Sequence, residues 1–203
     1  MKEAILNKSL KMFVTHGFKS ITMDDIAKEM GISKKTIYLH FGSKNDLVKA
    51  TVEYVYDSAS NRMRKLAGKC ESPIHEHFET RECVSELLGQ NIQPSAIYQF
   101  NKYYPDLAKW IDEKRHNDID STIIRNLKEG VKLGLYRKDI DVDFVGRIFF
   151  VIPYSFLNND VFQETLKSNT LEELNTKFLE YHLRGIVTLK GLEVLEQILK
   201  KIN

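Results

Sequence analysis

The sequence predicts an all-α protein of 203 residues. Apolar residues recur at the three- and four-residue spacing of a helix, and the alternation that would indicate strands is almost absent. Residues that cap or begin helices precede the apolar stripes, and Pro73, Pro94 and Pro105 each suit the first position of a helix. An apolar fraction of 42% allows a sizeable core, and 29% charged residues favour a soluble, folded chain.

The first half of the N-terminal region predicts two helices. A helix with an apolar face is expected to run from the N-terminus to Gly17, which suits the residue after a helix end. Thr22 then reads as an N-cap, with Asp25 three residues on as its capping-box partner. A second, short helix is therefore expected over residues 23–30.

A third helix follows after the tripeptide "GIS". Gly31 can adopt the left-handed conformation of a tight turn, and Ser33 is the cap of a helix expected over residues 34–41. Ser43 repeats the cap and begins a long helix that extends towards Leu66. Residues 2–41 are thus predicted to form three short helices.

The remainder of the chain is also predicted to be helical. One apolar stripe spans residues 119–131 and stops near Gly134, and a second spans residues 144–152, with Pro153 expected to kink its helix. Thr170 and Glu173 form a clear capping box in front of a further helix.

Composition excludes several classes of protein. The most apolar run, "RIFFVIPYSFL", is far shorter than the roughly 18–20 residues of a membrane span, and no signal peptide is evident, so we expect a cytoplasmic protein without a membrane segment. Cys70 and Cys83 do not form a CxxC pair and are expected to be free thiols. His75 and His77 lack the i, i+4 spacing of a helical zinc site, so no metal and no cofactor are predicted.

Positive charge gathers at the N-terminus. Residues 1–50 hold nine lysines against five acidic residues, whereas the rest of the chain is slightly acidic. Lys34, Lys35 and Lys44 stand in the first turns of two helices, where acidic residues are normally favoured. Any one of them is typical of a solvated surface, but the three together beside a glycine turn favour binding of an anion at the helix N-termini. Two helices joined by such a turn are the helix-turn-helix unit, whose second helix enters the DNA major groove.

The stretch "ITMDDIAKEMGISKKTIYLHFGSKNDLVKA" resembles the signature of TetR-type transcriptional regulators, and the resemblance is specific over residues 1–50. "EGVKLGLYRKDIDVDFVGRIFF" is similar to the turn before the family's dimer interface. Lys35 departs from the family, which often has Gly or Pro there. The resemblance implies a DNA-binding domain over residues 1–50, with its motif at about 23–41, and a helical ligand-binding and dimerisation domain over residues 51–203.

The resemblance also implies roles for individual residues. Bases are expected to meet the first turn of the recognition helix, and phosphates are expected to meet the residues around it. The implied DNA-binding residues are Thr22, Lys34, Lys35, Thr36, Tyr38, His40 and Lys44. Without the resemblance, Tyr38 and His40 are more typical of an amphipathic surface tyrosine and a surface histidine than of DNA-binding residues.

The family also binds a small inducer and forms homodimers. The resemblance implies that helices near residues 142–157 and 171–186 form the dimer interface, although apolar stripes of this kind are more often part of an ordinary core. Aromatic residues predict a pocket for an apolar or aromatic ligand, with the core as the alternative explanation for each ring. These candidates are Tyr98, Phe100, Tyr103, Trp110, Phe149 and Tyr154.

The sequence therefore predicts a sequence-specific DNA-binding regulator, in the form of a ligand-released repressor that binds a palindromic operator as a dimer. It is not expected to be an enzyme, because no GxSxG, HExxH or phosphate-loop motif is present. The alternatives are an activator of the same fold, or a helical small-molecule-binding protein or enzyme with a vestigial DNA-binding head.

Overall fold

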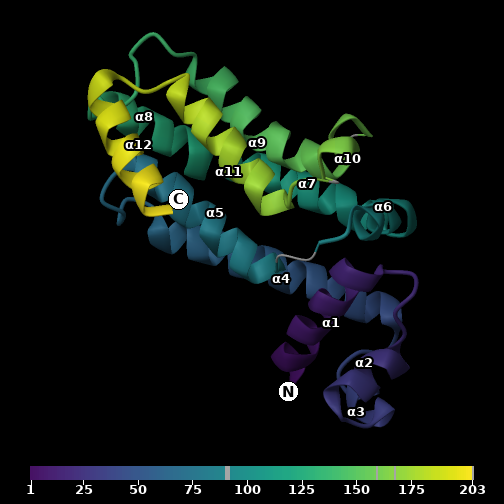
Figure 1. Ribbon diagram of the computed structural model, residues 1–203. Helices are drawn as coiled ribbons and strands as arrows, with labels where there is room; N and C mark the ends of the chain where they lie inside the picture. Colours follow the sequence, from purple (N-terminus) through teal and green to yellow (C-terminus); the bar gives the residue numbers. More distant parts are fainter. Residues whose placement is uncertain (90–91, 159, 167, 203) are drawn as a thin grey trace. The chain divides into compact units, whose positions relative to one another are not determined.

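The computed structural model describes residues 1–89, 92–158, 160–166 and 168–202. Throughout these residues the regular structure is helical, as predicted, apart from an antiparallel bridge between Tyr136 and Val187. The elements, shown in Figure 1, are α1 (Lys2–His16), α2 (Met23–Met30), α3 (Lys34–Tyr38), α4 (Lys44–Leu66), α5 (Pro73–Leu88), α6 (Pro94–Tyr103), α7 (Pro105–Ile119), the π-helical turn η1 (Asp120–Ile124), α8 (Arg125–Lys132), α9 (Val142–Asn158), α10 (Asp160–Leu166), α11 (Leu171–Arg184) and α12 (Leu189–Ile202). None of the helices in the described part of the chain is long and apolar enough to cross a membrane.

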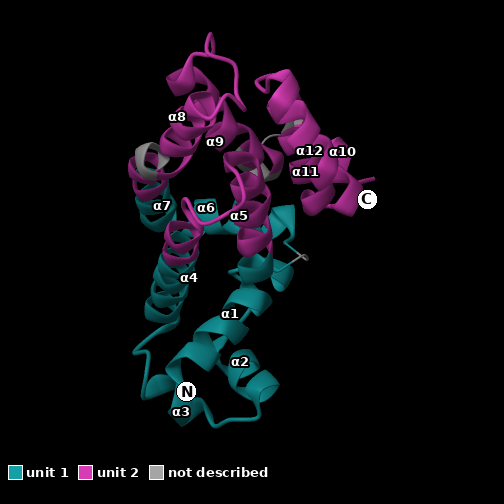
Figure 2. Ribbon diagram, turned by 90° about the vertical axis from the view of Figure 1, so that its left-hand side faces the viewer, with its two compact units in different colours: residues 1–60, 86–113 teal, residues 61–85, 114–203 magenta. Residues whose placement is uncertain are grey.

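The chain forms two compact units (Figure 2). Unit 1 contains residues 1–60 and 86–113, and unit 2 contains residues 61–85 and 114–203. The sequence places a boundary at residue 50, so unit 1 is larger than the predicted DNA-binding domain. Beyond residue 50 it includes residues 51–60 of α4, the end of α5 from residue 86, the whole of α6 and the first part of α7.

Unit 1 has one core, to which both α6 and the N-terminal head (residues 1–50) contribute side chains. The fully buried residues of this core are Ile5, Phe13, Ile26, Ile37, Leu47, Val48 and, on α6, Ala96. The ring centroid of Phe18 lies 5.1 Å from that of Phe13 and 5.0 Å from that of Phe100 on α6. The side-chain oxygen of Gln99 accepts a hydrogen bond of 2.9 Å from the backbone N–H of Lys19. Helix α6 is therefore an integral part of the head's core.

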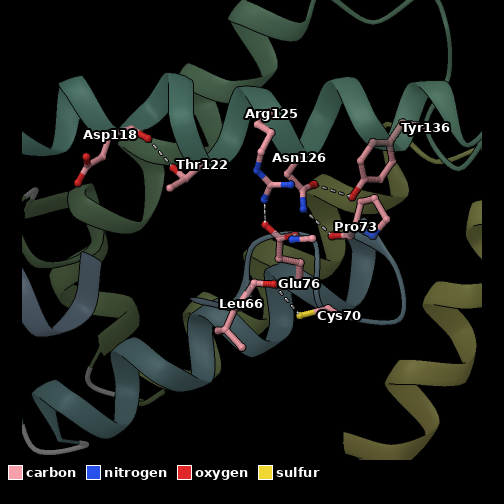
Figure 3. Close-up of polar contacts among 10 residues, drawn as sticks. Leu66, Cys70, Pro73, Glu76, Asp118, Thr122, Arg125, Asn126 and Tyr136 are labelled. Carbon is pink, nitrogen blue, oxygen red and sulfur yellow. Dashed lines mark hydrogen bonds and ion pairs between the residues drawn. The ribbon is translucent and has the colours of Figure 1, made fainter. Parts of the chain in front are cut away.

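Unit 2 is built around α5, α8, α9, α11 and α12. Its fully buried apolar residues include Ile74, Leu127, Leu183 and Leu195, together with Tyr136. The Tyr136 hydroxyl donates to Oδ1 of Asn126 at 3.3 Å, and Nδ2 of Asn126 donates to the carbonyl of Pro73 at 2.9 Å (Figure 3). This chain of hydrogen bonds fixes the start of α5 against α8 and satisfies polar groups that burial would otherwise leave unpaired.

The predicted helix starts are confirmed. Thr22 with Asp25 and Thr170 with Glu173 each form a reciprocal capping box, in which each cap side chain accepts from the N3 backbone and each N3 carboxylate accepts from the cap backbone. Prolines stand first in α5, α6 and α7, as predicted. Cys70 and Cys83 are both free thiols.

Two helices differ from their predicted form. The third helix was expected to reach residue 41 but ends at Tyr38, because the chain tightens there and His40 N–H bonds the carbonyl of Ile37. This tight turn still carries Phe41 into the core, where 4% of it is exposed. The stripe over residues 119–131 is interrupted by the π-helical turn η1, which shifts the register by one residue. Pro153 lies inside α9 as predicted, and the kink there stays a prediction.

Candidate nucleic-acid interface

Helix α2 begins with a strong cap. Thr22 is extended, and its hydroxyl accepts a 3.2 Å hydrogen bond from the backbone N–H of Asp25. In return, Oδ2 of Asp25 accepts from the Thr22 hydroxyl at 2.7 Å and from the Thr22 backbone N–H at 2.9 Å. These bonds lower the pKa of Asp25 below its usual value and keep a negative charge at the start of the helix.

The turn between α2 and α3 is set by Gly31, which adopts φ 65° and ψ 29°. Gly31 N–H bonds the carbonyl of Lys28, and Ile32 N–H bonds the carbonyl of Ala27 at 3.0 Å. This is the Schellman arrangement, which closes a helix and reverses the chain direction. Ser33 then caps α3 by accepting from the backbone N–H of Thr36 at 3.1 Å. This short turn thus sets the position of α3 relative to α2.

Helix α3 buries one residue, leaves one half-buried and exposes the other three. Ile37 is completely buried, whereas Tyr38 is 44% exposed and Leu39, directly after the helix, is 75% exposed. Lys34, Lys35 and His40 are exposed as well, and Thr36 is half-buried, with its hydroxyl 2.8 Å from that of Ser33. The exposed face therefore offers cationic, aromatic and hydroxyl groups to a partner.

Lys34 is held by an acidic residue that sequence reasoning missed. Its Nζ lies 2.7 Å from Oδ1 of Asp24 on α2 and 5.8 Å from the ring centroid of Tyr38. The hydrogen bond to Asp24 raises the pKa of Lys34. Both side chains are well exposed, so the pair is open to exchange with another anion. Nothing in the local pattern signals this pair, because its members lie ten positions apart across the turn.

Lys44, at the start of α4, also has an unforeseen partner. Its Nζ donates a 3.0 Å hydrogen bond to the backbone carbonyl of Lys19, in the segment between α1 and α2. Burial of the half-exposed side chain lowers the pKa of Lys44. Because an ammonium group has three N–H donors, this bond leaves two for an external acceptor.

All seven predicted DNA-binding residues therefore lie in unit 1, between the start of α2 and the start of α4. The predicted pocket residues do not gather in the same way. Tyr98, Phe100, Tyr103 and Trp110 belong to unit 1, where Tyr98 is 64% and Tyr103 43% exposed while Phe100 is buried in the core. Phe149 packs against the core of unit 2. The side chain of Tyr154 lies outside the part of the chain that the structure describes.

The comparisons with known proteins agree with this geometry. Residues 5–51 match the family described as bacterial regulatory proteins, tetR family. The uncharacterized HTH-type transcriptional regulator YerO of Bacillus subtilis is 29% identical over 192 residues, which cover 88% of this chain and 62% of YerO. The chain thus spans less than two thirds of the length of that relative.

Two further similarities extend beyond the head. The HTH-type transcriptional repressor KstR2 of Mycolicibacterium smegmatis is 28% identical over 148 residues, which cover 72% of each chain. The structure of the ketosteroid transcriptional regulator KstR2 of Mycobacterium tuberculosis aligns with a TM-score of 0.60 at 21% identity, over 92% of this chain and 95% of that one. Residues 5–51, which contain the capped α2–turn–α3 unit, thus match the tetR family of bacterial regulatory proteins, and most of the chain is similar to HTH-type transcriptional regulators.

Proposed function

We propose that this protein is a transcriptional repressor that binds a palindromic DNA operator as a homodimer and releases it when a small ligand binds. The observation that carries the proposal is the exposed, basic first turn of α3, held by the Schellman turn at Gly31 and the Ser33 cap. In helix-turn-helix proteins the N-terminal residues of the second helix contact base edges. Lys34, Lys35 and Thr36 occupy those positions here.

DNA binding would exchange internal contacts for contacts with DNA. Lys34 would leave Asp24 for a base acceptor or a phosphate, with both partners already exposed to solvent. Tyr38 and His40 are exposed at the end of α3 and suit phosphate contacts, as does the N-terminus of α4 with Lys44. Each phosphate that a lysine neutralises makes the slope of log affinity against log salt steeper by about 0.9.

Exposed apolar groups on unit 2 support the homodimer. Phe144 and Val151 are seven residues apart on α9, and they are 62% and 49% exposed. Tyr181 on α11, a helix that packs against α9, is 79% exposed. Large apolar side chains at such exposure on two adjacent helices favour a surface that a second copy covers. A dimer would present two copies of α3, which is what a palindromic site requires.

The proposal is tested by selecting genomic fragments with the purified protein and measuring binding to the enriched site by fluorescence anisotropy. We expect the wild-type protein to prefer this site strongly over a scrambled duplex of the same composition. In the Lys35→Ala protein the ratio of the two affinities should fall by about five- to 150-fold, because one contact with a base is lost. Lys132→Ala removes the same charge from an exposed position of unit 2 and serves as the control. Equal binding of the two duplexes by the wild-type protein would contradict the proposal.

A further inference from the structure

Unit 2 contains a group of buried polar atoms that have no hydrogen-bond partner among the described residues. They are Nε2 of His77, Nε of Arg81, Nε of Arg125, Oδ1 of Asn175 and Nε2 of His182. Buried polar groups in folded proteins are nearly always hydrogen-bonded, so a cluster of exceptions calls for a physical explanation. Four of the five belong to two helices, α5 and α11.

Arg81 is the most unusual member of the group. Only 15% of its side chain is exposed, and its guanidinium donates to the hydroxyl of Thr176 on α11. Its ion-pair partner is the outward-facing carboxylate of Glu82, at 3.9 Å, which is 64% exposed and too distant for a hydrogen bond. Buried charges are normally neutralised by a close counter-ion. Arg81 is therefore a largely buried cation without a close carboxylate partner among the described residues.

Arg125 provides a comparison within the same unit. Its guanidinium donates directly to the carboxylate of Glu76, as Figure 3 shows, and that carboxylate also accepts from the backbone N–H of Gly68 at 3.1 Å. The side chain of Glu76 is only 10% exposed. Among the residues that the structure describes, a buried carboxylate pairs with Arg125, and none pairs with Arg81 in this way.

A group of aromatic and imidazole rings in unit 2 includes His77, which lies one helical turn before Arg81 on α5. The ring centroid of Phe149 is 4.4 Å from that of His77 and 5.1 Å from that of His182, and Phe178 lies 5.3 Å from His182. His77 precedes Arg81 by four residues, which places the two side chains on one face of α5. Burial lowers the pKa of His77 to about 3 and that of His182 to about 4, so both imidazoles are uncharged at neutral pH. The rings therefore form an apolar group that contains two imidazole nitrogen atoms without a hydrogen-bond partner, and His77 links this group to Arg81 along α5.

We infer that Arg81 anchors a ligand site in unit 2 whose ligand is a small organic carboxylate with a flat apolar body. The carboxylate would pair with the Arg81 guanidinium, including its free Nε–H, in the bidentate geometry that arginine favours. The body would lie against Phe149, with polar substituents within reach of His77 and His182. An uncharged ligand of the same shape would leave the Arg81 charge unpaired. The role of this ligand as an inducer rests on the proposed function, whereas its binding does not.

The test uses the full-length protein and pairs of probes that differ only in charge. Benzoate and 2-naphthoate are compared with benzamide and 2-naphthamide by isothermal titration calorimetry at pH 7.5. We expect at least one carboxylate to bind ten-fold or more tightly than its amide. Absence of this preference in the wild-type protein would overturn the proposal, and this comparison depends on no variant.

Variants then assign the preference to Arg81. Arg81→Gln should abolish it, Arg81→Lys should retain part of it because the charge remains, and the control Lys132→Gln should leave it unchanged. A carboxylate preference that survives in a folded Arg81→Gln protein would overturn the assignment. If Arg81→Gln does not fold, Arg81→Lys decides, because an unchanged preference there would equally overturn the bidentate contact.

The regulatory role is measured separately from binding. The carboxylate is added to the protein–DNA complex, and the release of the labelled DNA is followed by fluorescence anisotropy. Binding without release would leave the carboxylate site in place and overturn its role as the inducer site. Failure of the protein to bind any DNA specifically would contradict the proposed function, while the calorimetry would still decide the ligand site.

Discussion

The buried imidazole of His77 makes the stability of the protein depend on pH in the acid range. His77 is 7% exposed, and burial is the main cause that lowers its pKa to about 3, with the neighbouring His182 and Arg125 acting in the same direction. In the unfolded chain a histidine titrates near 6.5. Between these values the unfolded state binds a proton that the folded state does not, so acid favours unfolding.

The size of the effect follows from the two pKa values. At pH 7.5 His77 is neutral in both states and contributes almost nothing to the pH dependence. At pH 5.0 the unfolded state is favoured by about 2 kcal/mol through this one group. His182 acts with the same sign, because its pKa is also lowered by burial, although it is less buried than His77.

The assay is urea unfolding at pH 7.5 and pH 5.0, followed by circular dichroism. His77→Gln removes the titration, so this variant should lose about 2 kcal/mol less stability between the two pH values than the wild-type protein does. His116→Gln removes an exposed imidazole of α7 and should behave as the wild-type protein. Equal losses in the wild-type protein and in His77→Gln would show that burial does not hold His77 neutral and would contradict the prediction.

Three further substitutions test the backbone and the DNA contacts. Gly31→Ala should cost about 1–2 kcal/mol in thermal denaturation, because φ is 65° there while a Cβ would meet no atom within 4 Å. Gly130→Ala should cost about 1–3 kcal/mol or more through overpacking, because its Cβ would lie 2.1 Å from the Tyr136 ring; a smaller loss than at Gly31 would contradict this packing. Lys44→Ala should reduce the slope of log affinity against log salt by about one, and an unchanged slope would reject its phosphate contact.

Local features of the head could be predicted because their causes lie within a few residues. The capping box of Thr22 and Asp25 spans three positions, and the left-handed turn at Gly31 follows from the absence of a side chain. The Ser33 cap is of the same kind. Each of these interactions forms between neighbours in the sequence, so the pattern of residue types is sufficient to identify it.

Interactions between distant segments could not be predicted. The aromatic residues of the sequence make Phe100 a candidate for a ligand pocket, whereas in the structure Phe100 packs against Phe18 in the core of unit 1. The bond from Lys44 to the carbonyl of Lys19 joins segments 25 residues apart. The incomplete pairing of Arg81 depends on which side chains of α11 face α5. Such contacts are decided by the packing of helices, about which a single sequence carries little information.

The measurement that tests the account most directly is the binding of the purified protein to its selected DNA fragment and to a scrambled duplex, across a titration of salt. Specific recognition by α3 predicts a palindromic site that binds two protomers. At physiological salt the protein should bind this site about a thousand-fold or more tightly than it binds the scrambled duplex. The affinity of the Lys44→Ala protein for this site should depend less steeply on the salt concentration than that of the wild-type protein. Weak binding that is equal for both duplexes would contradict the account, because it would mean that the basic head attracts DNA without reading its sequence.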